Sequence, residues 1–549
     1  MSAASQRSMR YFGQKLRFAE ALTKQAKQQG ISPRLVLGCL STTENGHVKF
    51  REETALRLGI KEKTFKLEHG DVDFSDVARD VLCSGDLHKL YRDLIPKERL
   101  AVDFSSPNIA KPFHVGHLGS TILGNFICNL KRSLGDEVVS INYLGDWGTQ
   151  FGILCTAYRR FGDDCKLTRK PLEHLLDVYV KGNRLAEVDD DFRQEAVENF
   201  AKLEAGDKDI RKMWWNFRDV SLKEYFKLYA KLGIKFDVIQ GEAVFHQDAL
   251  ELISQLKERG LLKESEGLSG LYVPENMFVP LVKSNGCTLY LTRDICAAIA
   301  RKKQLDVSTI YYVVDNGQTK HFSDLQKCLQ IIENDPVRIV HVKFSRISGL
   351  STRKGQVVLL EDLLIEAQKR TLKGMEDTVT TRVGPDEFEK TAQDLALAAL
   401  YVNSLKTRRL KPAAFDWEKC FSLKGDSGIS LQNAHARLCS LRTVNQIQPF
   451  YHEDILDELL QDANVREAIL VLAKFEESLL RADAMLEPCE VVIYMFRLAH
   501  AINRMTKTAR VKQEPNLQLA ETRLLLYVLL QQTLAEGLRL IGVRPLQQM

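Results

Sequence analysis

Apolar and polar runs near residue 100 predict a strand, a helix and a second strand. The short apolar run from Leu100 to Phe104 predicts a buried strand, and Glu137 to Leu144 predicts another. Between them, residues 105–113 are predicted as a loop and His117 to Leu134 as an amphipathic helix closed by Gly135. This order is typical of a βαβ unit, the building block of a parallel sheet.

The wider pattern predicts three domains. Residues 1–95 mix helix and strand signals, with a helix expected over Phe12 to Gln28, and predict an N-terminal α+β appendage. Strands and helices alternate over residues 96–380, which predicts an α/β catalytic domain built on a doubly wound parallel (Rossmann-type) sheet. Residues 381–549 repeat apolar positions at helical spacing and predict a C-terminal all-α helical bundle.

Within the central domain, the second half of the sheet is separated from the first by a long polar stretch. Leu172 to Leu232 and Val244 to Glu264 predict helices, and we expect an inserted helical region at about residues 155–285. Thr309 to Val314 and Ile339 to Phe344 are nearly continuous apolar runs, as buried parallel strands require.

Composition limits the class of protein. The chain has 549 residues, 44% hydrophobic and 27% charged, which is enough for several cores. A net charge of +5 excludes a global polycation, so any nucleic-acid surface must be local. The 11 cysteines form no CxxC pair, which disfavours a zinc site or a disulfide framework and indicates a reducing compartment. The longest apolar run near the end, Leu524 to Leu530, is too short to span a bilayer, so we expect no membrane contact.

The first residues are basic and allow two interpretations. A single acidic residue, Glu20, stands among the cations Arg7, Arg10, Lys15, Arg17, Lys24 and Lys27, with Ser2, Ser5 and Ser8 nearby. This composition is typical of a mitochondrial transit segment, and the alternative is a basic, solvated first helix of the mature domain. Both interpretations hold in part if cleavage falls very close to the start.

Two histidines stand where the first predicted strand passes into its helix. His114 and His117 are three residues apart, and the amides and dipole of a helix start favour bound phosphate. The unit has neither the GxGxxG dinucleotide fingerprint nor the P-loop sequence. Paired imidazoles over a phosphate site suggest stabilisation of charge at a reacting phosphorus.

The same residues resemble a known family. His114-Val115-Gly116-His117 resembles the HIGH signature of class I aminoacyl-tRNA synthetases, and SSPNIAKPFHVGHL over residues 105–118 is similar to the form found in arginyl-tRNA synthetases. Further similar segments follow in order at residues 142–148, 289–294, 350–355 and 425–438. The resemblance spans about residue 98 to the end, and it implies the Rossmann-type fold, ATP and L-arginine as substrates, and tRNA(Arg) as partner.

The resemblance also implies roles for individual residues. Those implied in catalysis are Lys111, His114, His117, Arg353 and Lys354. Those implied in arginine binding are Asp103, Ser106, Pro107, Asn108, His117, Tyr290, Asp294 and Gln318. A guanidinium is a planar fork of donors that pairs with carboxylates, which suits Asp103 and Asp294. On a helix start, Tyr290 and Asp294 would share one face.

ATP is expected to lie between the histidines and a second signature. The implied ATP contacts are Lys111, His114, His117, His321, Ser351, Arg353 and Lys354, although a satisfied polar histidine is an equal alternative for His321. This second signature, usually KMSKS in the family, resembles Gly349 to Lys354 here, where the usual first lysine is missing and Lys111 is expected to replace its charge. Mg²⁺ is expected to arrive with ATP, and no tightly bound protein metal site is expected.

The C-terminal part departs from the family pattern. The implied tRNA contacts are Gln432, His435, Arg437, Lys507 and Arg510, although basic clusters on helices are often only solvated faces. Ser430 and Asn433 replace tyrosines of the family, and Gly119 replaces an arginine.

The leading hypothesis is an arginine–tRNA ligase of the mitochondrial matrix, expected to be a monomer, with the cytoplasm as the alternative location. A catalytically reduced, synthetase-like RNA-binding or regulatory protein is the competing hypothesis. A third is another class I synthetase or a tRNA-independent adenylate-forming enzyme, which the acidic pocket disfavours.

Overall fold

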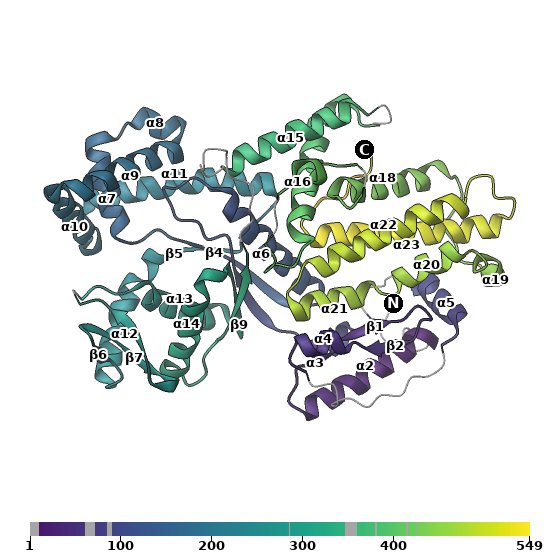
Figure 1. Ribbon diagram of the computed structural model, residues 1–549, viewed down its shortest axis with the longest axis horizontal. Helices are drawn as coiled ribbons and strands as arrows, with labels where there is room; N and C mark the ends of the chain where they lie inside the picture. The colour runs from purple at the N-terminus through teal and green to yellow at the C-terminus, as the bar shows by residue number, and fades with distance from the viewer. Residues whose placement is uncertain are drawn as a thin grey trace.

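A five-stranded parallel sheet lies at the centre of the molecule (Figure 1). The computed structural model describes residues 10–60, 72–84, 90–284, 286–345, 359–378, 382–412, 415–423 and 425–549. The strand order is β10-β9-β3-β4-β5, and the bounds are β3 Arg99–Asp103, β4 Glu137–Leu144, β5 Val238–Gly241, β9 Thr309–Asp315 and β10 Arg338–Phe344. The chain moves outward from β3 in both directions, which confirms the prediction of a doubly wound sheet.

Helices cover both faces of this sheet, so its strands are buried. Leu100 and Val102 of β3 belong to the core that includes helix α6 (Val115–Ser133), whereas Ala101 faces the opposite core. That second core is formed with α12 (His246–Glu258), α13 (Tyr290–Leu305) and α14 (Thr319–Ile332). Alternate residues of one strand therefore enter two cores, as expected of a parallel strand buried on both faces.

The segment expected to be a helical insertion has a mixed structure. Its helices are α7 Thr149–Phe161, α8 Asp164–Arg169, α9 Pro171–Val188, α10 Asp190–Ala205 and α11 Lys208–Leu232. The next element, β5, belongs to the central sheet, and an antiparallel sheet follows with β6 Lys263–Ser265, β7 Leu268–Val273 and β8 Met277–Val282. The region is thus not helical throughout. The sequence did not predict these strands because short edge strands with polar residues carry little periodic signal.

The N-terminal module combines helices with a two-stranded hairpin, as predicted. Its elements are α2 Arg10–Gln28, α3 Pro33–Leu37, β1 Leu40–Thr42, β2 Val48–Phe50, α4 Glu52–Arg57 and α5 Phe74–Ser84. Lys15 of α2 is buried, and its ammonium lies 2.8 Å from the carboxylate of Glu477 in the C-terminal domain. Lys15 is therefore part of the folded structure, which contradicts its assignment to a solvated or cleaved basic segment.

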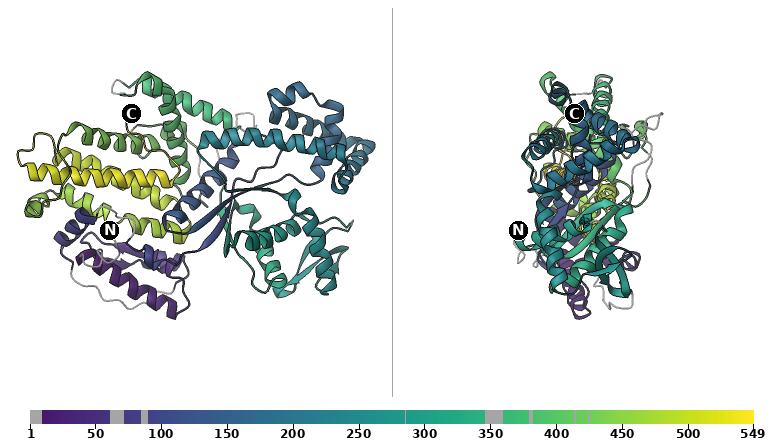
Figure 2. Two further views of the ribbon diagram at one scale, coloured as in Figure 1. Left: turned by 180° about the vertical axis from the view of Figure 1, so that it is seen from behind. Right: turned by 90° about the vertical axis from the view of Figure 1, so that its left-hand side faces the viewer.

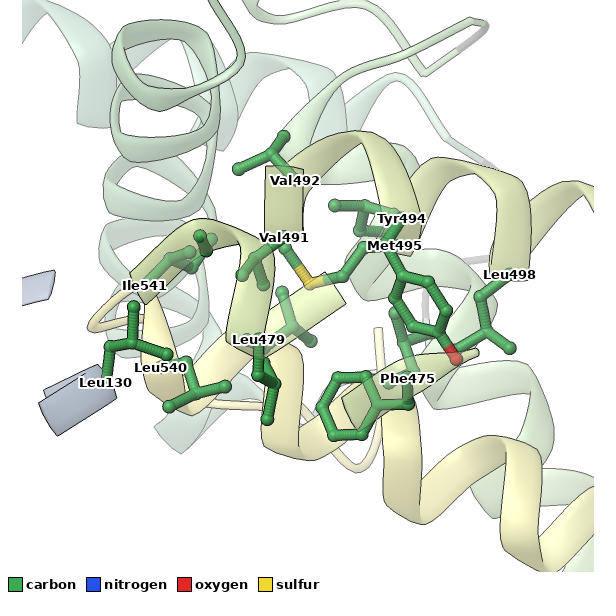
Figure 3. Close-up of a cluster of buried hydrophobic side chains, with 14 of the residues drawn as sticks. Leu130, Phe475, Leu479, Val491, Val492, Tyr494, Met495, Leu498, Leu540 and Ile541 are labelled. Carbon is green, nitrogen blue, oxygen red and sulfur yellow. The ribbon is translucent and has the colours of Figure 1, made fainter. Parts of the chain in front are cut away.

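The C-terminal domain is a bundle of helices, as predicted, and it packs beside the N-terminal module (Figures 1 and 2). Its helices are α15 Leu360–Glu376, α16 Phe388–Leu405, α17 Trp417–Cys420, α18 Gly428–Val444, α19 Leu456–Leu459, α20 Ala463–Leu472, α21 Phe475–Met485, α22 Cys489–Thr508 and α23 Leu517–Leu540. Leu130 of α6 reaches the core of this bundle near Leu540 and Ile541 (Figure 3). Each helix in the described ranges is too short or too polar to cross a bilayer.

A buried cluster of four charges joins the three parts of the molecule. Arg34 of α3 pairs with Asp136, which precedes β4, at 2.6 Å and with Asp483 of α21 at 3.0 Å. Lys131, in the last turn of α6, pairs with the same Asp483 at 2.7 Å. We call these residues the interdomain charge cluster. One end of α6 is thereby attached to the helical domain, while its other end begins beside His114.

Candidate active site

The loop between β3 and α6 has an unusual backbone conformation. Ser105, Ser106 and Ala110 have positive φ angles of 71°, 44° and 63°, a region that side chains other than glycine rarely adopt. Two serine hydroxyls hold this conformation. The Ser105 N–H donates to the Ser120 hydroxyl of α6 at 3.1 Å, and the Ser106 hydroxyl donates to the Asp103 carboxylate at 2.7 Å.

The two histidines meet at the start of α6. His114 is the N-cap residue, its Nδ1 accepts from the Gly116 N–H at 3.1 Å, and its ring centroid lies 3.8 Å from that of His117. Burial, assisted by His114, lowers the pKa of His117 to about 4, so its ring is neutral near pH 7. His117 Nδ1 accepts from the His114 N–H at 3.2 Å. The proton therefore belongs on Nε2, which can donate to a phosphoryl oxygen.

The chain just after the second signature lies beside His114 and Phe113. Leu359 forms a β-bridge with His114, and the Leu360 N–H donates to the Phe113 carbonyl at 2.9 Å. Ser351, Arg353 and Lys354 themselves lie outside the described residues. α15 begins at Leu360.

Lys111 faces the helices of the insertion. Its ammonium lies 5.2 Å from the ring centroid of Tyr179 in α9, a cation–π distance. Its carbonyl accepts from the Tyr225 hydroxyl of α11 at 2.7 Å. The loop before His114 is therefore supported from the insertion as well as from the sheet.

Tyr290 and Asp294 lie one turn apart at the start of α13, as their spacing suggested. Asp294 Oδ2 lies 2.8 Å from His321 Nε2, and His321 follows the turn that carries the exposed Gln318. Burial lowers the pKa of His321, but the hydrogen bond to Asp294 and the charges of nearby carboxylates together raise the pKa above the usual value. His321 thus has a carboxylate partner, in agreement with its interpretation as a satisfied polar histidine.

Sequence reasoning missed a second carboxylate near Asp294. Glu242 follows β5, and its carboxylate lies 3.2 Å from the Arg293 guanidinium. Burial raises the pKa of Glu242 to about 7, Arg293 opposes this rise, and the charge of Asp294 adds to it. No motif marks Glu242, because it lies in a turn after a short edge strand, and only the fold brings it near Asp294.

Asp103 has a different environment from the one expected. Its Oδ2 accepts from the Arg301 guanidinium of α13 at 2.8 Å, and its Oδ1 accepts from Ser106. Asp103 is buried, and Arg301 is completely so. Arg301 therefore already pairs with this carboxylate, and the expected contact with the substrate guanidinium would require Asp103 to turn away from Arg301.

The segment at residues 142–148 holds the loop and the insertion together. Residues 107–109 exchange backbone hydrogen bonds with Gly145, and a Cβ on Gly145 would lie 2.0 Å from the Asn108 side-chain oxygen. Asp146 accepts from Arg218 of α11 and from the Ala243 N–H, both at 2.9 Å. Gly145 is thus required by the close approach of Asn108, which is itself exposed.

The five residues implied in tRNA contact fall into two groups. Gln432 and His435 are fully buried and bind the last residues of the chain: the Gln432 amide donates to the Arg544 carbonyl, and His435 contacts the Leu546 carbonyl. This contradicts the prediction that Gln432 and His435 contact tRNA directly, because both side chains are buried and form hydrogen bonds within the domain. Ser430, where the family has tyrosine, completes a capping box with Ser427.

The other group is exposed. Arg437, Lys507 and Arg510 lie on the surface, and Arg437 and Arg510 line a cavity of about 1180 Å³. Further cations line the same cavity, namely Arg370, Arg382 and Lys512. A local basic surface of this kind is what a chain of small net charge requires to bind nucleic acid. Within the described ranges, no three His, Cys, Asp or Glu side chains are placed to hold a metal ion.

Comparisons with known proteins cover most of the chain. A family profile described as "tRNA synthetases class I (R), catalytic domain" matches residues 80–417, and one described as "DALR anticodon binding domain" matches residues 431–549. The chain is 38% identical over 483 residues to "Probable arginine--tRNA ligase, mitochondrial" of Bos taurus, covering 86% of this chain and 83% of that protein. It is 35% identical over 474 residues to "Arginine--tRNA ligase, cytoplasmic" of Saccharomyces cerevisiae, covering 83% and 77%.

Solved structures show the same fold. The arginyl-tRNA synthetase of Thermus thermophilus superposes with a TM-score of 0.74 at 20% identity, covering 96% of this chain and 99% of that one. The arginyl-tRNA synthetase of Plasmodium falciparum superposes with a TM-score of 0.71 at 24% identity, covering 97% and 92%.

Proposed function

This chain belongs to the class I tRNA synthetases specific for arginine, and we propose that it activates L-arginine with ATP and transfers the arginyl group to the 3′ end of tRNA(Arg). One observation carries the proposal. The neutral His117 at the start of α6 and the carboxylates of Asp294 and Glu242 lie at the carboxyl edge of one parallel sheet, where ligands of such sheets bind.

The geometry suits each step of this reaction. An oxygen of the arginine carboxylate attacks the α-phosphorus of ATP, an O–P bond forms, and the bond to pyrophosphate breaks. The Nε2–H of His117 donates to the phosphoryl oxygen that gains charge, and Lys111 offers a point charge from the preceding loop. Mg²⁺ enters with ATP as part of the substrate. The tRNA hydroxyl then attacks the adenylate carbonyl, and AMP leaves.

Asp294 and Glu242 account for the choice of amino acid. Two carboxylates beside the exposed Tyr290 ring supply acceptors for a planar guanidinium. Arg293 and His321 already pair with these carboxylates, so the arginine guanidinium would share them with cations of the chain, and a neutral side chain would gain no ionic contact here. Arginine is therefore favoured over neutral amino acids.

The basic cavity and the named relatives support a tRNA-binding surface and a cellular location. We assign tRNA binding to the cavity lined by Arg437 and Arg510, with Lys507 in the last turn of α22 as a further contact. We place the enzyme in the mitochondrial matrix, which the names of several relatives support, and expect a monomer. Fractionation of cells that express a tagged chain, and light scattering of the purified protein, test these two points.

Aminoacylation of tRNA assayed across all the standard amino acids tests the function. Arginine-dependent pyrophosphate exchange, measured with and without tRNA(Arg), separates activation from transfer. Charging with arginine alone is expected. A protein that binds tRNA but turns over no amino acid would instead be the catalytically reduced regulatory protein, and charging with another amino acid would refute the assignment to arginine.

A further inference from the structure

Arg301 is completely buried behind the candidate amino-acid pocket, although it belongs to none of the recognised motifs. Its Nη1 donates to Asp103 at 2.8 Å and to the Tyr312 hydroxyl at 3.1 Å, and its Nε donates to the Gln240 side chain at 3.2 Å. The guanidinium also lies over the ring of Tyr143, at 4.7 Å from the centroid. A charge buried this deeply, with hydrogen bonds from Nε and Nη1, fixes the position of the groups that those two atoms contact.

Arg301 is linked to the loop between β3 and α6 through Asp103, the last residue of β3. Asp103 accepts from Arg301 through one oxygen and from the Ser106 hydroxyl through the other. The Ser106 hydroxyl in turn accepts from the Tyr143 N–H at 3.2 Å. Ser106 has a φ of 44°, so this chain of bonds ends on a residue whose conformation must be held by its surroundings.

We propose that Arg301 is a positioning residue for arginine activation. It acts through Asp103 and Ser106 to fix the strained backbone that presents Asn108, and it does not touch the substrate. This inference rests on the proposed function. It separates two tasks within one pocket: Asp294 and Glu242 receive the guanidinium, whereas the loop held by Arg301 receives the amino and carboxylate groups of arginine.

The alternative is that Asp103 turns from Arg301 to the substrate guanidinium. The two possibilities predict different effects on the affinity for a ligand that lacks the amino and carboxylate groups. n-Propylguanidine has the guanidinium of arginine but lacks both the amino and the carboxylate group. A defect confined to the loop therefore spares its binding, whereas a defect in a guanidinium acceptor weakens both ligands.

The test is the variant Arg301→Lys in the full-length protein. Lysine keeps the charge but cannot reproduce the planar fork, so the bonds to Asp103, Tyr312 and Gln240 cannot all form. We expect the affinity for arginine, measured by ligand-observed NMR, to fall by about tenfold or more, and that for n-propylguanidine to change by less than about twofold. Equal weakening of both ligands would overturn the inference, and so would unchanged arginine binding.

Two further variants separate positioning from loss of stability. Ser106→Ala removes the hydroxyl that links Asp103 to the loop. It should also lower the affinity for arginine and leave that for n-propylguanidine nearly unchanged. Combined with Arg301→Lys it should add little, because both act along one chain of bonds. Arg481→Lys is a matched control, since this half-buried guanidinium of α21 lies 3.6 Å from Glu490, away from the pocket. Its binding of both ligands should equal that of the wild type.

If Arg301→Lys does not fold, as judged by thermal unfolding, Ser106→Ala alone decides between the two alternatives. A wild-type protein that bound no arginine would refute the proposed function. A wild-type protein that bound arginine, with variants that lost both ligands equally, would refute only the role given to Arg301.

Discussion

Asp294 has two possible cationic partners, its own His321 and the guanidinium of the substrate. The imidazole lies 2.8 Å from the carboxylate, and this bond raises the pKa of His321 despite burial. The protonated ring therefore competes with arginine for Asp294. We expect the KM for arginine to fall as pH rises from about 6.5 through the raised pKa of His321, because deprotonation leaves the carboxylate free to bind the guanidinium.

Steady-state kinetics of pyrophosphate exchange over pH 6 to 9 measure this effect. His321→Gln keeps a hydrogen-bond donor without a titrating charge, so its KM should vary much less over the same range. A KM for arginine that stays constant in the wild type, or that varies equally in the variant, would contradict competition at Asp294.

Unlike His321, His117 should not change its protonation state between pH 6 and 9. Burial lowers its pKa to about 4, so the neutral ring and its Nε2–H persist from about pH 5 upward. We expect His117→Ala to lower the rate of adenylate formation by about a hundredfold while the KM for arginine changes little. A loss shared equally between KM and kcat would place His117 in the amino-acid pocket instead.

Motif spacing located the residues whose chemistry is local in sequence. His114 and His117 lie at one helix start, and Tyr290 and Asp294 within one turn of another, so the sequence could place each pair. Arg301 and Glu242 could not be found this way. Their partners, Asp103 and Asp294, are distant in the chain, and only the packing of α13 against the sheet brings them together.

At the scale of elements, α6 contains two glycines that meet different surroundings. A Cβ on Gly119 would lie 3.5 Å from the Phe344 ring, an ordinary contact, whereas a Cβ on Gly124 would lie 2.1 Å from the Phe104 ring. Gly119→Ala should raise the free energy of unfolding by about 0.5–1 kcal/mol, because alanine favours a helix interior. Gly124→Ala should lower it by about 1–3 kcal/mol, because the helix must move away from Phe104.

Urea unfolding of both variants, followed by circular dichroism, gives the comparison directly. Each change serves as the control for the other, since both place one methyl group on the same helix. Destabilisation by Gly119→Ala would mean that α6 tolerates no side chain facing β10. Stabilisation by Gly124→Ala would mean that α6 does not approach Phe104 closely.

Strong periodicity made most elements predictable, and weak periodicity explains the exceptions. The strand expected over Glu137 to Leu144 occurs with those bounds, and the one expected at Thr309 extends by one residue to Asp315. By contrast, β5 has only the residues Val-Ile-Gln-Gly, and it pairs with β4 because the chain returns to the sheet edge. Its place in the sheet is a tertiary property that four residues cannot encode.

At the scale of the whole molecule, the interdomain charge cluster attaches the catalytic helix α6 to the helical domain. Lys131 and Arg34 both pair with Asp483, and all three side chains are nearly inaccessible. Asp483→Asn would leave the buried Lys131 without its charge partner and Arg34 with Asp136 alone, so we expect the free energy of unfolding to fall by about 3–5 kcal/mol. Because Lys131 lies on the helix that begins beside His114, arginine activation should slow as well.

Glu477→Gln is the matched control for this prediction. Glu477 also forms a buried ion pair between two domains, with Lys15, but neither residue lies on α6. Its loss should lower stability to a similar extent and leave the activation rate of the folded protein unchanged. Equal activation rates in both variants, measured well below their unfolding temperatures, would show that the attachment of α6 has no influence on chemistry.

The burial of Lys15 also has a consequence for how the protein is made. The ammonium donates to the Ala473 carbonyl, 458 residues later in the chain, and pairs with Glu477 at the beginning of α21. During translation α2 therefore leaves the ribosome long before its partners exist, and until then its lysine must remain in water. The N-terminal module can only be completed when α21 has emerged. A nascent chain that stalls before α21 would present an unfinished N-terminal module to the chaperones of the cell.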